Sequence, residues 1–599
     1  MKKILLSIAF ALMGIASGFA AKAYSGIITV TQSDGTELNV RMYGDEHFNW
    51  LTTEDGVLLV QEGNNYYIAE TTSYGTLKAT KFIAHNANKR VSAEIKAIKK
   101  QNHSRFRSYA IEQASTAKSL GTGNYGVKYF PHSGSPKALV ILVEFSDTTF
   151  QSGEKAKNVF EHFLKGNVED ALPDGYEAYT GSYKNKNLLR NKGSVSDYFY
   201  DMSKGTYTPQ FDVVGPYKLN HSSLYYGQGD KDNTYALVSD ACKAADKDID
   251  FSQYDADGDG MVDLVYIIYA GYPASMSGNP NDIWPQSGPG DGSLGTYDGK
   301  QVRRFGVHAE LNFGWALNQK NGFLLSGIGL FCHEFSHTLG LPDLYPTVDA
   351  SKVDNQNPEM WDLMDGGEYT FNGGYCPTPY SPWELDVMGW TSPVELGDEA
   401  KQVKLNSYHK ERTAYKINGE NDEYLLIQNI QKGGWWNGIA NVYNTGMLIW
   451  RIDYGTKDVN LFDNPNNNIG KPKVMIVPAD GYVISDYNHG DGKQWTDAEY
   501  KASLQADPFP GATNKTELLS VELNNSTLKK PFYNIKETDG VITFDYLKDF
   551  ATGIDSPVIQ QNQEKDTRIF SLDGRYLGTD ASQLTKGVYI IGKKKVIIK

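Results

Sequence analysis

One short stretch carries residues whose types and spacing suit a metal site. In GIGLFCHEFSHTLGLPDLY, His333 and His337 fall four residues apart, so on a helix their imidazoles lie on one face and can share a zinc ion. Glu334 can deprotonate a zinc-bound water as general base. Gly340 can end the helix in a left-handed conformation and return Asp343 as a third ligand. Three protein ligands leave one position open, as in catalytic zinc sites.

Two alternatives to this ligand set remain open in the sequence. A glutamate from a later helix, Glu359 or Glu368, could be the third ligand in place of Asp343, but neither opens a recognisable helix. Cys332 adjoins His333, yet on a helix it points about 100 degrees away from its neighbour, so we interpret it as a small core residue.

A second cluster of carboxylates has the spacing of a calcium loop. YDADGDGMVD alternates carboxylates with glycines, a pattern that converges oxygen ligands on a hard cation. The candidate calcium ligands are Asp255, Asp257, Asp259, Met261 and Asp263. Tyr266 stands where an EF-hand has glutamate, and a strand-like run follows in place of a helix. A solvated acidic turn is the alternative, and we expect a calcium ion that stabilises the fold without taking part in chemistry.

The segments around these clusters differ in pattern. From Ser25 to about Glu94, short alternating runs separated by SDG, GDE and EDG predict β-hairpins. A polar, basic stretch between about Lys96 and Tyr125 predicts a linker. KALVILVEFSD then predicts a strand buried on both faces. After Trp390, runs such as EYLLIQNI and GMLIWRIDY separated by Gly, Asn and Asp predict a β-sandwich.

Composition excludes several classes of protein. The chain has 599 residues, too many for one core, and its 40% hydrophobic and 12% aromatic content excludes a disordered or fibrous protein. The formal charge of -14 and the absence of long basic runs disfavour nucleic acid as a partner. Three cysteines cannot supply a disulfide framework for a chain of this length.

The first residues have the pattern of a signal peptide. Lys2 and Lys3 precede an apolar run that ends in small residues, and we expect cleavage after Ala20, Ala21 or Ala23. The run is too short and too often broken for a membrane anchor, and no later segment predicts a transmembrane span. We therefore expect a protein that is secreted or lies on the outer cell surface.

The extended motif HExxHxxGxxD, with Met364 following in MWDLMDGGEY, resembles the metzincins. Within that clan the chain is most similar to the immune inhibitor A-like secreted bacterial metalloproteases, from about Gly26 to Gly511. Further similar stretches are VILVEFSD, SVSDYFYDMSKGTYTPQFDVVGPY, YDADGDGMVDLVYIIYAG, PYSPWELDVMGW, GMLIWRIDY and DPFPG. The resemblance implies zinc ligands at His333, His337 and Asp343, a catalytic base at Glu334 and a Met-turn at Met364.

Together these patterns predict an α+β protein with a metzincin-like mixed α/β catalytic domain between two β-rich parts. The predicted parts are a signal peptide (1–23), a β-rich propeptide with its linker (24–125), the catalytic domain (126–390), a β-sandwich module (391–550), a second linker (551–567) and a C-terminal tail (568–599).

Two expectations concern processing and export. The segment before the catalytic domain resembles a propeptide without cysteine, so a carboxylate such as Asp45 could cap the metal; an ordinary turn residue is the alternative. Activation would need a cut near Arg105 or Arg107. The tail RIFSLDGRYLGTDASQLTKGVYIIGKKKVIIK resembles the sorting domain of Bacteroidetes type IX secretion, which implies secretion machinery as a partner. A β-tail packed on the preceding module is the alternative.

The function expected from the sequence is zinc-dependent hydrolysis of peptide bonds in extracellular proteins, with protein or peptide substrates, zinc, and a calcium ion as cofactors. The competing hypothesis is a surface adhesin or glycan-binding protein, suggested by 39 tyrosines, 10 tryptophans and the β-rich C-terminal half. An adhesin would give no reason for the sequence HEFSHTLGLPD.

Overall fold

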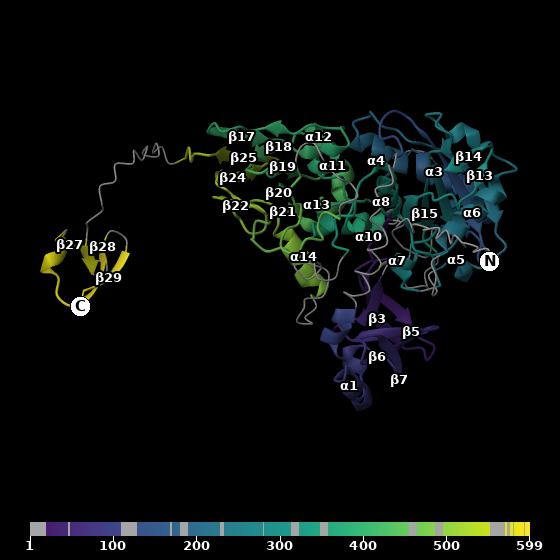
Figure 1. Cartoon of the computed structure of the whole chain (residues 1–599), viewed down its shortest axis with the longest axis horizontal. Coiled ribbons are helices and arrows are strands. Elements are labelled where there is room, and N and C mark those ends of the chain that lie inside the picture. Colours follow the sequence, from purple (N-terminus) through teal and green to yellow (C-terminus); the bar gives the residue numbers. More distant parts are fainter. Residues whose placement is uncertain are drawn as a thin grey trace, which may run out of the picture. The chain divides into compact units, whose positions relative to one another are not determined.

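A computed structural model gives the architecture (Figure 1). It describes residues 19–45, 48–109, 129–167, 171–179, 190–227, 233–279, 281–312, 323–347, 357–454, 464–484, 495–551, 569–571, 576–578, 580–591 and 594–598. Most of the predicted signal peptide, part of the first linker and all of the second linker except Ala551 lie outside these residues. The described parts form a mixed α/β protein with several sheets, consistent with the predicted α+β class.

The N-terminal region folds into a six-stranded antiparallel sheet in which each strand pairs with the next along the chain. Its strands are β2 (Ile28–Thr31), β3 (Glu37–Gly44), β4 (Asn49–Thr53), β5 (Leu58–Glu62), β6 (Asn65–Thr71) and β7 (Leu77–Ile83). The predicted hairpins are therefore present. The polar stretch after this sheet is more structured than a linker: α1 (Ser92–Ile98) opens it, and Phe106 is buried against the sheet. Apolar residues of this stretch, among them Phe106, pack against the sheet and hold the stretch on it.

The metal motif lies beside a second six-stranded sheet, ordered β1-β12-β15-β11-β8-β9. Strands β15, β11, β8 and β9 run parallel to one another. Strand β12 is antiparallel to β15, and β1 is antiparallel to β12. The bounds are β1 (Phe19–Ala20), β8 (Lys137–Glu144), β9 (Gln210–Lys218), β11 (Val265–Tyr269), β12 (Gln286–Pro289) and β15 (Arg304–Ala309).

Helices cover both faces of this sheet, which explains why β8 is apolar throughout. Val140 and Leu142 pack with one layer of helices, whereas Leu139 and Ile141 pack with α6 (Thr234–Ala245) on the opposite face. The first layer consists of α3 (Ala156–Lys165), α4 (Val195–Met202) and α8 (Ile328–Leu339). The buried strand predicted from KALVILVEFSD is confirmed.

Two further sheets follow in the C-terminal region. A five-stranded sheet is ordered β16-β18-β19-β20-β21, and a three-stranded sheet is ordered β17-β25-β24. The two faces of β19 pack in different cores. Leu425 and Ile427 pack between the two sheets, whereas Leu426 packs in the core that contains α8, the helix with His333 and His337. The bounds are β16 (Val394–Glu395), β17 (Lys401–Leu405), β18 (Tyr415–Asn418), β19 (Tyr424–Ile430), β20 (Gly446–Ile452), β21 (Val474–Ile476), β24 (Phe532–Thr538) and β25 (Val541–Tyr546).

Shorter elements complete the described chain. They include α5 (Ser223–Tyr226), α7 (Ala274–Ser277), α11 (Pro382–Val387), α12 (Tyr408–Glu411), α13 (Asn437–Tyr443), α14 (Asp497–Gln505), β10 (Met261–Val262), β13 (Thr296–Tyr297), β14 (Lys300–Val302), β22 (Val521–Glu522) and β23 (Thr527–Leu528). Residues 548–599 form a separate compact unit. Its sheet is ordered β27-β26-β28-β29, with β26 (Ile569–Ser571), β27 (Tyr576–Gly578), β28 (Gly587–Ile591) and β29 (Lys594–Ile598).

Candidate metal centre

The helix α8 presents the two predicted histidines from the interior of the protein. Every residue from Ile328 to Leu339 is buried, so the helix forms by packing its whole circumference. It ends at Gly340, whose φ of 107° lies in the left-handed region. The amide of Leu341 donates to the carbonyl of Ser336, which closes the C-terminal turn as predicted.

After this turn the chain brings Asp343 back beside the histidines. The Oδ1 atom of Asp343 lies 3.3 Å from Nε2 of His333 and 3.3 Å from Nε2 of His337. The two Nε2 atoms are 3.2 Å apart. Ligand atoms bound about 2.0 Å from a tetrahedral zinc ion are about 3.3 Å apart, so this triangle has the size of one face of such a site.

Backbone carbonyls fix the orientation of both imidazoles. Nδ1 of His333 donates to the carbonyl of Leu363 at 2.9 Å, and Nδ1 of His337 donates to the carbonyl of Leu341 at 2.7 Å. A carbonyl only accepts, so Nδ1 carries a proton, and in the neutral imidazole the Nε2 lone pair then points into the triangle. This tautomer is the one that binds a metal through Nε2.

The protonation states also suit a metal site. Burial lowers the pKa of His333, which favours a neutral imidazole. Burial alone would raise the pKa of Asp343, but the adjacent His337 and His333 bring it down to about 2. A neutral imidazole and an ionised carboxylate are the forms that bind a cation.

Glu334 and Met364 lie in the same buried region. Both side chains have no exposed surface. The carbonyl of Met364 accepts a hydrogen bond from the amide of Leu344 at 2.8 Å, which ties the Met364 segment to the loop that carries Asp343. Burial raises the pKa of the nearby Tyr369, and the carboxylates of Glu368 and Glu334 raise it further. Glu334 therefore stands within electrostatic reach of a second polar side chain at the site.

The alternative ligands occupy other positions. Glu368 lies 3.8 Å from Nδ1 of His333, on the opposite side of the ring from the Nε2 triangle. Glu359 pairs instead with Lys22. Among the described residues, the group with ligand atoms within 4.8 Å of one another contains Asp343 and neither glutamate. Cys332 is fully buried and burial raises the pKa of its thiol, in keeping with a core residue.

The Asp255 loop brings three of its predicted ligands together. Carboxylate oxygens of Asp255, Asp257 and Asp259 lie within 4.8 Å of one another. Asp263 instead accepts a hydrogen bond from the amide of Ala256 at 2.9 Å, and Met261 begins β10. Cations already adjoin the loop, since Lys300 lies 2.7 Å from Asp255 and Arg303 pairs with Asp259.

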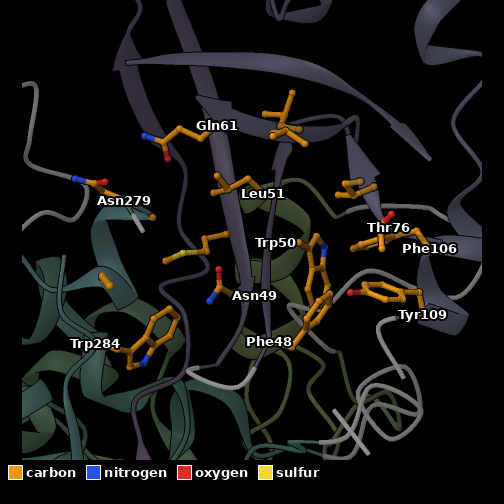
Figure 2. Close-up of a pocket in the computed structure, with 16 residues that line it drawn as sticks. Phe48, Asn49, Trp50, Leu51, Gln61, Thr76, Phe106, Tyr109, Asn279 and Trp284 are labelled. Atoms are coloured by element: carbon orange, nitrogen blue, oxygen red, sulfur yellow. The ribbon is translucent and has the colours of Figure 1, made fainter. Parts of the chain in front are cut away.

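The predicted capping residue Asp45 closes its own turn. Its carboxylate accepts from the amide of Phe48 at 3.2 Å, and its side chain is buried. Beside this turn, a cavity of about 410 Å³ lies between the N-terminal sheet and the segment from Ala274 to Trp284. Figure 2 shows aromatic side chains of the N-terminal region on one side and Trp284 on the other. None of the predicted site residues lines this cavity.

Sequence reasoning missed one buried group of charges near the centre. Nζ of Lys22 lies 2.9 Å from Asp365, and Glu359 belongs to the same group. These residues are more than 330 positions apart in the chain, so no local spacing could reveal them. The only sequence feature that pointed to this group was Met364, the predicted Met-turn residue, because Asp365 follows it directly.

Two histidines on a buried helix, a carboxylate on the loop that follows it and a glutamate next to the first histidine are the groups of a metal-dependent hydrolase site. Residues 128–390 match the family model "Immune inhibitor A peptidase M6, catalytic domain". Over these residues the chain is similar to the catalytic domain of immune inhibitor A-like M6 metallopeptidases, and two curated relatives agree with this similarity.

The chain is 27% identical over 324 residues to "Immune inhibitor A" of Bacillus thuringiensis subsp. alesti, covering 45% of this chain and 43% of that protein. It is 23% identical over 281 residues to "Pre-pro-metalloprotease PrtV" of Vibrio cholerae serotype O1, covering 42% and 29%. The chain thus spans less than half the length of either relative. Among the described residues, no helix is long and apolar enough to span a membrane.

Proposed function

We propose that the protein is a secreted zinc-dependent endopeptidase whose metal is held by His333, His337 and Asp343. The observation that carries this proposal is the triangle of Nε2, Nε2 and Oδ1 atoms with sides of 3.2 to 3.3 Å. Its donors fit zinc, since two are imidazole nitrogens and one is a carboxylate oxygen. Zinc bound there supplies a Lewis acid for the carbonyl of the scissile peptide bond.

In this proposal Glu334 is the general base and then the general acid. Its carboxylate takes a proton from the attacking water and later delivers that proton to the amine that leaves. No covalent intermediate is needed. The buried surroundings of Glu334 exclude bulk water, which strengthens its electrostatic interactions with the reacting groups. Met364 contributes packing beneath the ligands and no chemistry.

The comparisons support peptide hydrolysis over the adhesin hypothesis. The matched family model is that of a peptidase catalytic domain, and one relative is named as a metalloprotease. A glycan-binding protein would have no need of two imidazoles with fixed tautomers in its interior. The name "Pre-pro-metalloprotease" also describes a relative with a leader and a propeptide, which supports the same processing of residues 1–23 and 24–125 here.

Replacing Glu334 with Gln tests the mechanism. We expect the Glu334→Gln protein to keep its zinc, measured by plasma mass spectrometry, while kcat/KM for casein falls by about 10² to 10⁴ because the base is lost and the ligands stay. Glu420→Gln, at an exposed carboxylate, serves as the matched control and should keep the parental rate. A Glu334→Gln protein that digests casein at the parental rate would contradict the assignment.

Two further parts of the chain complete the proposal. We place a calcium ion in the Asp255 loop, where it would stabilise the fold. Activation would follow a cut near Arg105, which is exposed, or Arg107. Full activity in the uncut precursor would contradict a latent form.

For residues 568–599 we propose a role in export through the outer membrane. The region forms a small sheet in a compact unit of its own, too small to carry an active site. Deleting Arg568 to Lys599 should leave folded, active enzyme in the periplasm. Normal appearance of the truncated protein outside the cell would contradict the role in export.

A further inference from the structure

The chain's own N-terminal segment lies along the edge of the sheet beside the metal helix. Residues Phe19–Ala20 form β1, the edge strand of this sheet, which pairs antiparallel with β12, and both strands contact α8. Addition of an extended strand to a sheet edge is a common way for proteins to bind peptides. The segment therefore occupies a place where an extended peptide can bind next to the metal ligands.

The backbone of the next two residues, Ala21 and Lys22, is also held by hydrogen bonds. The indole Nε1 of Trp284 donates to the carbonyl of Ala21 at 2.8 Å. The hydroxyl of Tyr369 donates to the carbonyl of Lys22 at 2.7 Å. Because these donors contact the backbone, they would hold a peptide of another sequence in the same way.

The side chain of Lys22 enters an acidic pocket. Its Nζ lies 2.9 Å from Oδ1 of Asp365 and 3.5 Å from Oε2 of Glu359. All three side chains are at most 2% exposed. Two buried carboxylates without a cation would be strongly unfavourable, so the pocket requires a positive charge.

The pocket is built independently of Lys22. Oδ2 of Asp365 accepts from the amide of Glu359 at 2.7 Å, and Oδ1 accepts from the amide of Gly366 at 2.7 Å. The hydroxyl of Tyr500, on α14, donates to Oε2 of Glu359 at 2.7 Å.

The pocket also adjoins the metal centre. Asp365 follows Met364 directly, and Glu368, three residues later, lies 3.8 Å from His333. Tyr369, which holds the Lys22 carbonyl, follows Glu368 directly in the chain. One short segment thus joins the acidic pocket to the residues proposed to carry out hydrolysis.

We propose that Glu359 and Asp365 form a side-chain pocket of the substrate groove that selects lysine or arginine in peptide substrates, and that Lys22 fills this pocket until the N-terminal segment leaves. The proposal rests on the peptidase function proposed above. The expected signal-peptide cuts differ in what they leave behind. Cleavage after Ala20 or Ala21 removes β1 and keeps Lys22 in the precursor, so Lys22 can fill the pocket there. Cleavage after Ala23 removes Lys22 as well, and the two carboxylates then need the cation of a substrate.

Cleavage-site profiling tests the pocket. The processed protein recovered from the medium is incubated with a peptide library, and the cleaved sites are read by mass spectrometry. We expect lysine and arginine to be enriched at one position relative to the cut. Two peptides that differ only in lysine or norleucine at that position then give the selectivity, which we expect to be about tenfold or more in kcat/KM.

Glu359→Gln should reduce this selectivity to about threefold or less, whereas the control Glu420→Gln should keep it. Should Glu359→Gln fail to fold, Tyr500→Phe removes only the hydroxyl that holds Glu359 and should lower the lysine preference while the norleucine peptide is still cut. A purely structural role for these carboxylates would lower both rates alike.

The outcomes separate the two proposals. Metal-dependent cleavage without a preference for basic residues, or with a preference that these variants leave unchanged, would overturn the pocket and leave the peptidase intact. Absence of any metal-dependent cleavage would overturn the peptidase function and the pocket with it.

Discussion

The His333 cluster and the Asp255 loop both gather candidate metal ligands, but they do so in different ways. In the first, side chains are at most 5% exposed, and the carbonyl of Leu363, thirty residues further along the chain, orients His333. In the second, carboxylates of neighbouring residues accept hydrogen bonds from the amides of their own loop, and Asp257 and Asp259 are exposed.

The buried cluster is the one that can support chemistry. A buried cluster with fixed tautomers keeps its geometry without the metal and so can leave one coordination position open for a reactant. An exposed loop adjusts to its ion and is already partly neutralised by Lys300 and Arg303, so an ion there contributes stability. The predictions below test that contrast.

The largest expected effect is loss of zinc from the buried cluster. In His337→Ala the metal loses one of three protein ligands, and we expect the zinc content to fall to background and peptidase activity to disappear. Asp257→Ala is the comparison, since it alters the exposed loop and should retain zinc. Metal content is measured by plasma mass spectrometry and folding by circular dichroism. Unchanged zinc stoichiometry in His337→Ala would contradict the ligand assignment.

A smaller effect is expected when calcium is removed at constant zinc. An ion that binds only the folded protein stabilises it by about 2.7 kcal/mol at a concentration one hundred times its Kd. We therefore expect a calcium-selective chelator to lower the thermal midpoint of the parent and to have no effect on Asp257→Ala. If the parent melts identically with and without calcium, Lys300 and Arg303 suffice as the counterions of the loop.

The smallest effect concerns the two left-handed glycines of the two sites. Gly340→Ala strains the turn that returns Asp343, at a cost of about 1 to 2 kcal/mol, and we expect zinc affinity to fall about tenfold. Gly258→Ala, at a φ of 72° with open space around it, carries similar strain in the Asp255 loop. Competition with a zinc chelator measures the zinc affinity of both variants. Equal zinc affinities would show that the turn does not position Asp343.

The sequence predicted features that depend on neighbouring residues. The helical spacing of His333 and His337 and the left-handed turn at Gly340 follow from local geometry, and the structure has both. The apolar run from Lys137 to Glu144 is likewise a strand with both faces covered. The linker prediction after Lys96 was incomplete, because a single aromatic residue, Phe106, can anchor a segment that otherwise looks solvated.

By itself, then, the sequence determined the metal motif, because an i, i+4 pair and a glycine turn are set within one segment of backbone. Only the tertiary structure decided that the carbonyl of Leu363 orients His333 and that Lys22 meets Glu359 and Asp365 across more than 330 residues. Those contacts form where distant segments share one buried core. Their partners are set by the packing of the whole fold, for which no local spacing exists.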